Sequence, residues 1–168
     1  MTLDAGTFDG LVWRYIPAWS YPLHAGFLLQ AAGRWNRYGE YGCLYTALTR
    51  EGAAAEYDKV RAQVGLSAAD DDRKDLVSIR IVVRPVLDLT DPAAQERYGV
   101  TTATLTSDDA RGLETCRSVA DLARAEGYRA ILAPSAALAG GTNLNVYLEG
   151  RAAELRLRDG PDRVPLNY

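Results

Sequence analysis

The sequence predicts an α+β fold in which a mixed sheet is flanked by helices. Three observations lead to this prediction. The chain has 168 residues, the length of one domain around one hydrophobic core, so we expect a single domain over residues 1–168. Strand and helix patterns follow one another without the regular alternation of a doubly wound sheet. The apolar fraction of 48% and the charged fraction of 24% are ordinary for a globular protein and exclude general disorder.

The first third of the chain contains two predicted strands. Residues 11–16 (LVWRYI) and 42–47 (GCLYTA) are rich in the β-branched and aromatic side chains that favour strands. Between them, Pro17 and Pro22 interrupt regular structure, and residues 24–32 are predicted to form a short helix. The rest of this connection is polar, aromatic and glycine-containing.

A helix is predicted next, from an N-cap at Thr49 to about Val64. Glu51 lies in the first turn, where a negative charge complements the helix dipole, and Gly65 is typical of a helix end. The most polar stretch of the chain follows, residues 69–75 (ADDDRKD). We predict that it is an exposed loop rather than a metal site.

The clearest strand covers residues 76–83 (LVSIRIVV), and residues 86–89 continue it after Pro85. A helix is predicted to begin at Asp91 and Pro92, because an acidic cap followed by proline suits a helix start. The chain contains no internal repeat and no linker rich in Pro, Gly or Ser.

A longer helix is predicted from residues 107–109 (SDD) to Gly127, with an apolar stripe at helical spacing. The stripe and its flanks consist of Leu113, Cys116, Val119, Ala120, Leu122 and Ala123. The remaining predicted elements are a strand over residues 128–133, a turn over 139–142, a strand over 145–148 and a last strand over 153–157.

Charge and composition exclude several classes of function. The 19 Lys and Arg against 22 Asp and Glu give a net charge of −3, whereas tight nucleic-acid binding needs a basic surplus. One histidine and two distant cysteines do not form the usual structural zinc site, so no metal is expected. The acidic N-terminus is unlike a signal peptide, and no apolar run reaches the roughly 18–20 residues that span a bilayer. We therefore expect a cytoplasmic protein without membrane contact.

Glu56 is out of place on its predicted helix. Apolar residues at helical spacing form a stripe, and Glu56 lies on or beside it. The stripe consists of Ala53, Tyr57, Val60 and Val64. A carboxylate in such a position is unfavourable unless it is paired or used. From the residues alone, a salt bridge to an arginine at the edge of the stripe is favoured over a functional role.

Arg14 raises the same question in the first strand. Alternate residues of a strand share a face, so Arg14 points to the same side as Val12 and Ile16. A buried arginine usually holds a carboxylate or a phosphate, whereas on an outer face it is simply solvated. The residues alone favour neither interpretation.

Three further residues are candidates with ordinary alternatives. Arg34, in the stretch GRWN, has the guanidinium that clamps a pyrophosphate, but an exposed arginine in a turn shows the same pattern. Tyr45 suits either a site or a core. Ser135 follows a strand, yet the chain lacks a GxSxG motif and has only His24 as a base, which argues against a Ser–His hydrolase. Neither GxGxxG nor a Walker loop is present.

Taken together, these residues resemble the RES domain family, named for its Arg, Glu and Ser. The matching motifs, in order, are WRY at 13–15, GRWN at 33–36 followed by Gly39, LYTA at 44–47, AAE at 54–56, GY at 127–128, PSA at 134–136 and GTNL at 141–144. Their order and spacing agree over most of the chain. The series of GRWN, Tyr and Glu is fairly specific, and the late motifs reinforce it.

The resemblance implies a toxin of a bacterial toxin–antitoxin pair with an ADP-ribosyltransferase-like fold. Such an enzyme breaks the bond between nicotinamide and ribose in NAD⁺, with water, phosphate or a protein side chain as the acceptor. No cofactor is implied, because NAD⁺ is the substrate, and phosphate is a co-substrate where it is the acceptor. The residue types suit this chemistry, since cleavage builds positive charge on the ribose and a fixed carboxylate stabilises that charge.

The resemblance also implies roles for individual residues. Arg34, Glu56 and Ser135 form the implied catalytic group. Glu56 would stabilise the ribose cation, Arg34 would bind phosphate groups of the dinucleotide, and Ser135 would hydrogen-bond the ribose or the nicotinamide amide. The implied substrate-binding residues are Arg14, which also binds phosphates, Tyr45 and Tyr15, which pack against nicotinamide or ribose, and Asn143, which braces the site.

The implied partner is an Xre-like helix-turn-helix antitoxin, which covers the active site and carries any DNA binding. Family members often form dimers, so a homodimer is one expected state. Two alternatives remain beside NAD⁺ glycohydrolase or phosphorylase activity. One is the transfer of ADP-ribose to a protein target, and the other is a catalytically inactive module that binds a nucleotide or a partner.

Overall fold

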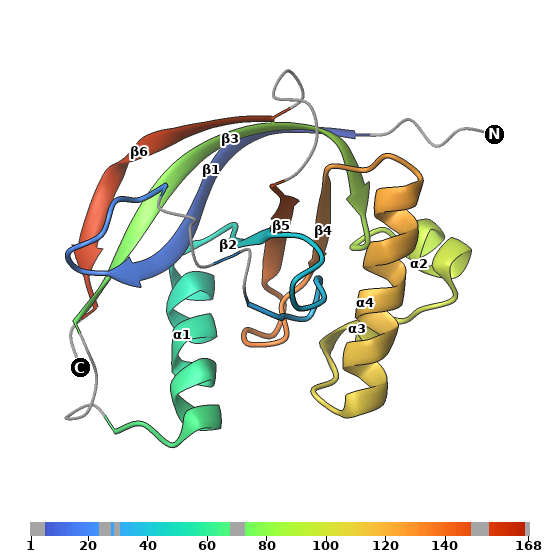
Figure 1. Cartoon of the computed structure of the whole chain (residues 1–168), viewed down its shortest axis with the longest axis horizontal. Coiled ribbons are helices and arrows are strands. Elements are labelled where there is room, and N and C mark those ends of the chain that lie inside the picture. The colour runs from blue at the N-terminus through green and yellow to red at the C-terminus, as the bar shows by residue number, and fades with distance from the viewer. Residues whose placement is uncertain (1–5, 24–27, 29–30, 68–72, 149–154, 167–168) are drawn as a thin grey trace.

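The computed structural model has the mixed α+β architecture that the sequence predicts, with a central sheet and flanking helices (Figure 1). It describes residues 6–23, 28, 31–67, 73–148 and 155–166. Within these ranges the strands are β1 (Gly6–Pro17), β2 (Cys43–Ala47), β3 (Lys74–Asp88), β4 (Ala130–Pro134), β5 (Thr142–Tyr147) and β6 (Leu155–Pro165). The helices are α1 (Arg50–Val64), α2 (Pro92–Tyr98), α3 (Thr102–Thr106) and α4 (Ala110–Ala125).

The sheet is organised around β3, which has three neighbours. Most of its length pairs antiparallel with β1 on one side and with β6 on the other. Its last residues, from Val86 to Asp88, pair parallel with β4. The strand order is β1-β2-β5-β4-β3-β6, and the additional β1–β3 pairing closes the first five strands of this order into a ring.

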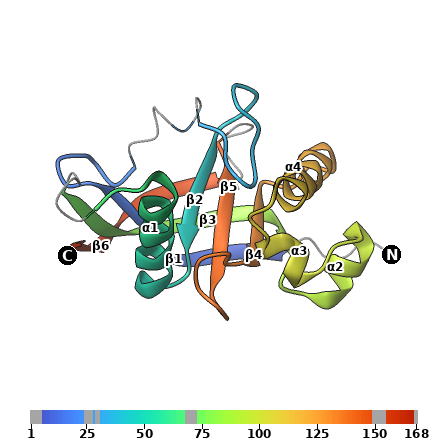
Figure 2. The same ribbon diagram turned by 90° about the horizontal axis from the view of Figure 1, so that it is seen from below.

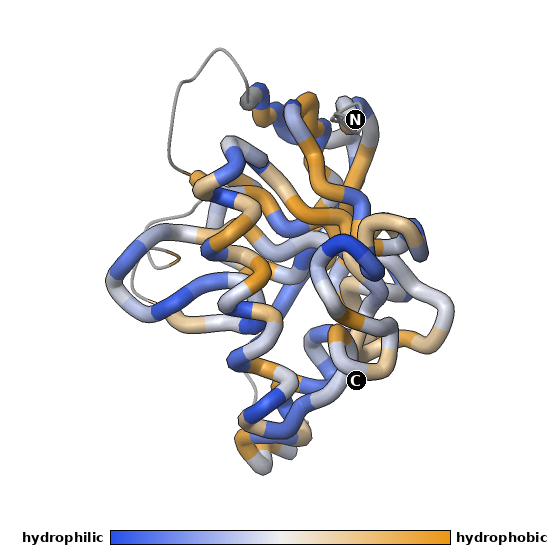
Figure 3. Tube along the Cα trace, turned by 90° about the vertical axis from the view of Figure 1, so that its right-hand side faces the viewer, coloured by the Kyte–Doolittle hydropathy of each residue, from blue (hydrophilic) through white to orange (hydrophobic). Residues whose placement is uncertain are grey.

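Two large clusters of buried side chains fill most of the interior, and a third, smaller cluster contains Ala47, Ala53 and Leu76. One cluster lies inside the ring and takes residues from each of its five strands, such as Val12, Leu44, Ile81, Ala130 and Leu144. The other lies between helices α2, α3 and α4 and the strands beside them, and it includes Ala94, Leu105, Cys116, Ala120 and Ile131. Figure 2 shows α1 on one side of β2 and β5, with the other helices on the opposite side. Figure 3 shows hydrophobic and hydrophilic residues interspersed along the described chain.

The helix starts follow local capping chemistry and confirm the predicted boundaries. The Thr49 hydroxyl accepts a hydrogen bond from the Gly52 amide, and Gly65 ends α1 with a left-handed φ of 68°. Asp91 caps α2 and Asp109 caps α4 in the same way. In each cap the two contacting residues are only two or three positions apart, so the sequence alone is enough to predict them.

Three features of the helices were not predicted from the sequence. The stripe of α1 is buried only in its first half, since Val60 is 39% and Val64 is 62% exposed. Figure 1 gives the reason, because the second half of α1 extends beyond the sheet. Leu122 is also exposed on α4, and the five-residue helix α3 was not predicted. None of the helices in the described ranges is long and apolar enough to cross a membrane.

The strand predictions are confirmed in place but not in extent. The first strand begins earlier, at Gly6, and the last strand runs on to Pro165 rather than ending at residue 157. Both extensions pair with β3. The length of such pairing depends on strands that are distant in sequence, so a local sequence pattern does not predict it. Much of the predicted short helix, including residues 24–27 and 29–30, lies outside the described residues.

The polar stretch over residues 69–75 is not a loop throughout. Its last two residues belong to β3, and Asp75 is only 7% exposed, while residues 68–72 lie outside the description. Arg163 of β6 donates to the Asp75 carboxylate and to the carbonyl oxygens of Ala18 and Ser20. Burial of Asp75 is therefore compensated by a charged partner, as a buried carboxylate requires.

Gly160 allows β6 to lie against β3, and its substitution is a test of this packing. A Cβ at this position would lie 2.2 Å from the Ser78 hydroxyl and 2.6 Å from the Ser78 carbonyl carbon, which cannot move aside. We expect Gly160→Ala to lower the free energy of unfolding by about 1–3 kcal/mol in urea denaturation. Gly6→Ala is the control, because the nearest atom to its Cβ is 3.9 Å away. Equal stability of the two variants would contradict the packing described.

Candidate active site

The carboxylate of Glu56 is held by two side chains from the other side of the molecule. The Ser135 hydroxyl donates to Oε1 of Glu56 over 2.9 Å, and the Asn143 amide donates to the same oxygen over 2.6 Å. Both donors reach Oε1, so among the described residues Oε2 has no hydrogen-bond donor and is left for a ligand. Helix α1 is thereby joined to β5 and to the turn that follows β4.

Ser135 is oriented by the backbone. Its Oγ accepts hydrogen bonds from the amides of Ala137 and Leu138, each at 3.1 Å. Two N–H groups therefore occupy its acceptor sites, and its own hydrogen is directed to Glu56. Ser135 is only 6% exposed, so its hydroxyl serves the carboxylate rather than a ligand in this structure. The structure shows a contact of Ser135 with Glu56, and its contact with ribose or nicotinamide stays a prediction.

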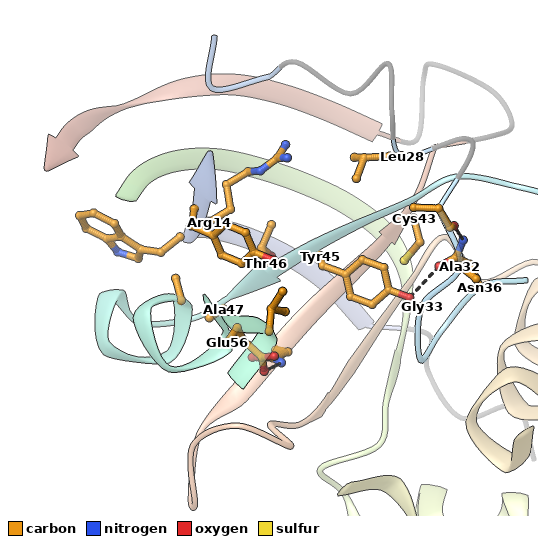
Figure 4. Close-up of a pocket in the computed structure, with 16 residues that line it drawn as sticks. Arg14, Leu28, Ala32, Gly33, Asn36, Cys43, Tyr45, Thr46, Ala47 and Glu56 are labelled. Atoms are coloured by element: carbon orange, nitrogen blue, oxygen red, sulfur yellow. Dashed lines mark hydrogen bonds between the residues drawn. The ribbon is translucent and has the colours of Figure 1, made fainter. Parts of the chain in front are cut away.

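The Glu56 carboxylate lines a cavity of about 310 Å³. A cavity of this volume has the size of a small-molecule site. Residues from β1, β2, α1 and β5 line it (Figure 4). Five of the seven predicted site residues are among them, namely Arg14, Tyr15, Tyr45, Glu56 and Asn143. We refer to this space as the Glu56 cavity.

Arg14 lies on the inner face of β1, so the outer-face alternative is wrong. Its side chain is 6% exposed, and the guanidinium donates to the carbonyl of Pro22 over 3.4 Å. Burial lowers the pKa of Arg14 to about 10, which leaves it a cation at neutral pH. Figure 4 shows the guanidinium extending away from Glu56. The cavity therefore has a positive end and a separate negative end.

Tyr45 is fixed by a tight turn. Its hydroxyl accepts from the Trp35 amide over 2.8 Å and donates to Oδ1 of Asn36 over 2.7 Å. Burial raises the pKa of this hydroxyl well above its ordinary value, so it remains a neutral donor. Gly33 is required for the contact, because a Cβ there would lie 2.1 Å from the Tyr45 oxygen. The ring is thus a rigid wall of the Glu56 cavity.

Tyr15 lies near the acidic end of the cavity. Burial raises the pKa of its hydroxyl, and the negative charge of Glu56 raises it further. Its ring is tilted against that of Tyr57, with 4.8 Å between the ring centroids. These contacts keep Tyr15 uncharged and fixed in place.

Arg34 belongs to a second cavity rather than to the first. This cavity, of about 350 Å³, shares Tyr45, Glu56 and Asn143 with the Glu56 cavity. The Arg34 guanidinium donates to the carbonyls of Leu105 and Ser107 and forms an ion pair with Asp108. The three distances are 3.0, 2.6 and 2.6 Å. The loop that holds Tyr45 is thereby anchored to the segment between α3 and α4.

Three residues of this second cavity, which we call the Arg34 cavity, were not predicted as site residues. Lys59 on α1 contacts Asp108 over 2.7 Å and the carbonyl of Ala136 over 2.9 Å, and Arg117 of α4 donates to the carbonyl of Gly33. Lys59 lies three residues after Glu56, which places both on one helical face. That spacing was the available signal, whereas nothing local marked Asp108 as more than part of a helix start.

The remaining candidates add no further reactive group to the described part of the site, although Cys43 lines the Glu56 cavity. His24 lies outside the described residues. Within the described part of the chain, no group of three His, Cys, Asp or Glu side chains is arranged to hold a metal ion. Cys43 and Cys116 are free and buried, and burial raises the pKa of both thiols, which suppresses the reactive thiolate.

The chain is similar to known proteins over nearly its whole length. The RES domain family matches residues 11–166. A Mycobacterium tuberculosis protein with the name "Probable NAD(+) phosphorylase" is 32% identical over 147 residues, which are 88% of this chain and 68% of that relative. A chain in the crystal structure of the M. tuberculosis MbcT–MbcA toxin–antitoxin complex matches with a TM-score of 0.73 and 25% identity. This match covers 95% of the present chain and 85% of the other.

The close approach of Gly33 to Tyr45 generates a test. We expect Gly33→Ala to lower the free energy of unfolding by about 1–3 kcal/mol, because the added Cβ overlaps the tyrosine oxygen. Combining it with Tyr45→Phe removes that oxygen but keeps the ring carbon Cζ, which lies 2.6 Å from the added Cβ. The overlap is therefore relieved in part, and the double variant should be more stable than the sum of the single effects predicts. The measurement is a double-mutant cycle in urea, and strictly additive effects would show that the two residues do not meet.

Proposed function

The chain belongs to the RES domain family, and from this we propose that it degrades NAD⁺ by breaking the bond between nicotinamide and ribose. The relative carries the name "Probable NAD(+) phosphorylase", and the similar solved chain is part of a toxin–antitoxin complex. The observation that carries the proposal is the Glu56 carboxylate, which two hydrogen bonds hold at the wall of a cavity with a cation at its other end.

Glu56 suits the chemical demand of this cleavage. Departure of nicotinamide leaves positive charge on the anomeric carbon and ring oxygen of the ribose. A carboxylate that is already oriented stabilises this charge without reorganising during the reaction. Ser135 and Asn143 hold Oε1, so Oε2 is the oxygen that faces the ribose. Both are therefore positioning residues in this proposal.

Arg14 suits the other end of the substrate. A dinucleotide carries its pyrophosphate several bonds away from the nicotinamide ribose, and Arg14 extends away from Glu56 (Figure 4). A buried guanidinium binds phosphate oxygens strongly, because both partners are charged and water is excluded. Between these ends, the rings of Tyr15 and Tyr45 offer flat surfaces for nicotinamide and ribose.

For Arg34 we propose a role other than the pyrophosphate binding that the resemblance implies. Its guanidinium lies in the Arg34 cavity and is held by carbonyl groups there. We propose that it contributes to acceptor binding on the far side of Glu56. NAD⁺ is then a substrate rather than a retained cofactor, and inorganic phosphate is the co-substrate.

The toxin role includes a partner. The similar chain is part of a toxin–antitoxin complex, and we propose that an antitoxin likewise neutralises this protein. We propose that this antitoxin is Xre-like and covers the Glu56 cavity. For the toxin itself, we propose a single domain with an ADP-ribosyltransferase-like fold and a homodimeric state. Because its substrate is a metabolite of the cell interior, we expect it to act in the cytoplasm.

Substitution of Glu56 tests the activity. Glu56→Gln keeps the shape of the side chain and removes its charge, so nicotinamide release should fall about 100-fold to 1,000-fold. The control is Glu51→Gln, which removes an exposed carboxylate from the first turn of the same helix and should leave release unchanged. The measurement is nicotinamide release with mass identification of the ribosyl product. Undiminished release by Glu56→Gln, or label from NAD⁺ on protein instead of a small product, would contradict the proposal.

Substitution of Ser135 tests the positioning of the carboxylate. Ser135→Ala removes one of two hydrogen bonds to a charged group, so we expect kcat to fall about 10-fold to 100-fold. The KM for NAD⁺ should change little, because Ser135 does not line the cavity. Ser135→Thr keeps the hydroxyl and should restore most of the rate. A rise in KM with unchanged kcat would instead indicate direct substrate contact.

A further inference from the structure

The Arg34 cavity contains a carboxylate bound as an anionic ligand would be. Oδ1 of Asp108 lies 2.6 Å from Arg34 and 2.7 Å from Lys59, so two cations from different elements converge on one oxygen atom. A guanidinium and an ammonium around one oxyanion are the groups that proteins use for phosphate. The Asp108 carboxylate therefore stands where an oxygen atom of a small inorganic anion would bind.

The two cations keep their positions without Asp108. Arg34 also donates to the carbonyls of Leu105 and Ser107, and Lys59 also donates to the carbonyl of Ala136. Their side chains are 13% and 20% exposed, whereas that of Asp108 is 50% exposed. The cations are thus built into the cavity wall, and the carboxylate is the group that can leave.

We propose that Arg34 and Lys59 form the binding site for the inorganic phosphate acceptor, and that Asp108 fills this site in the free protein. The inference rests on the proposed function, and it identifies the co-substrate site. Arg117 lines the same cavity and adds a third positive charge. Together these cations offset the repulsion between phosphate and the nearby Glu56 carboxylate.

The location of this site fits the transfer step. Lys59 and Glu56 lie three residues apart on α1 and line the same cavity, so phosphate bound by Lys59 approaches the ribose end of the substrate. One oxygen of hydrogen phosphate donates an electron pair to the anomeric carbon, and the bond from that carbon to the pyridinium nitrogen breaks. Its electrons remain on that nitrogen. The products are neutral nicotinamide and ADP-ribose phosphorylated at the anomeric carbon, and no proton transfer or redox partner is required.

Asp108 then competes with phosphate for the two cations. Removal of the competing charge should strengthen phosphate binding, whereas removal of a cation should weaken it. These opposite signs separate the proposal from a general loss of stability, because a damaged protein would bind less phosphate in both cases.

The test measures binding of inorganic phosphate by calorimetry without NAD⁺. We expect Lys59→Met to weaken binding at least about tenfold, since a charge-assisted hydrogen bond is lost. Asp108→Asn should strengthen it severalfold. Arg50→Gln is the matched control, because it removes an exposed cation from the same helix, and it should bind phosphate as the wild type does. In kinetic assays, the KM for phosphate should move in the same directions while the KM for NAD⁺ changes less than twofold.

The outcomes distinguish this site from the proposed function. Equal phosphate affinity in the wild type and Lys59→Met, or weaker affinity in Asp108→Asn, would overturn the phosphate site. If the wild type cleaves NAD⁺ at a rate that does not depend on phosphate, the proposed phosphate site is wrong and the activity is that of a glycohydrolase. If the variants show the expected changes in phosphate affinity but the wild type does not cleave NAD⁺, the phosphate site is supported and the proposed reaction is wrong.

Discussion

The pair of hydrogen bonds on Glu56 determines how the rest of the site is arranged. Helix α1 follows β2 directly, and without Ser135 and Asn143 its carboxylate would be one more charge at the edge of a half-buried helix. The two donors come from the β4–β5 region and tie the helix to the far strands of the ring. This connection fixes one carboxylate oxygen, orients the other and creates the wall between two cavities.

The turn that contains Gly33 forms the second support. On one side it holds the Tyr45 hydroxyl, and on the other Arg34 extends to the carbonyl of Leu105 in α3 and to that of Ser107 just after α3. Arg117 of α4 donates back to the carbonyl of Gly33. The cavity wall and the helical layer are therefore one hydrogen-bonded unit, and movement of α4 would move the aromatic ring.

Features of the fold that depend on contacts between neighbouring residues could be predicted from the sequence. Features that depend on contacts between residues far apart in the chain could not. Thr49 and Asp91 cap helices through contacts within three residues, so their positions follow from the sequence. The full extent of β6 depends on pairing with β3, which no local pattern shows. Glu56 was recognised as anomalous on its helix, but its partner Ser135 is 79 residues away, and only the family resemblance connected them. Lys59 and Asp108 were overlooked because each suits an ordinary exposed position until the fold brings them together.

The site is assembled from both ends of the chain, since Arg14 lies on β1 and Asn143 on β5. β5 is inserted between β2 and β4, so the ring cannot close before this late strand has been added. The pairing of β2 with β5 joins segments about 100 residues apart, and such non-local pairing is slow because loop closure costs entropy before the contacts form. A chain that is still being synthesised therefore contains Glu56 before Ser135 and Asn143 can hold its carboxylate. Its cavity also lacks the side formed by β5. The proposed cleavage of NAD⁺ therefore cannot begin until β5 has been synthesised and paired, and the protein is inactive during that interval.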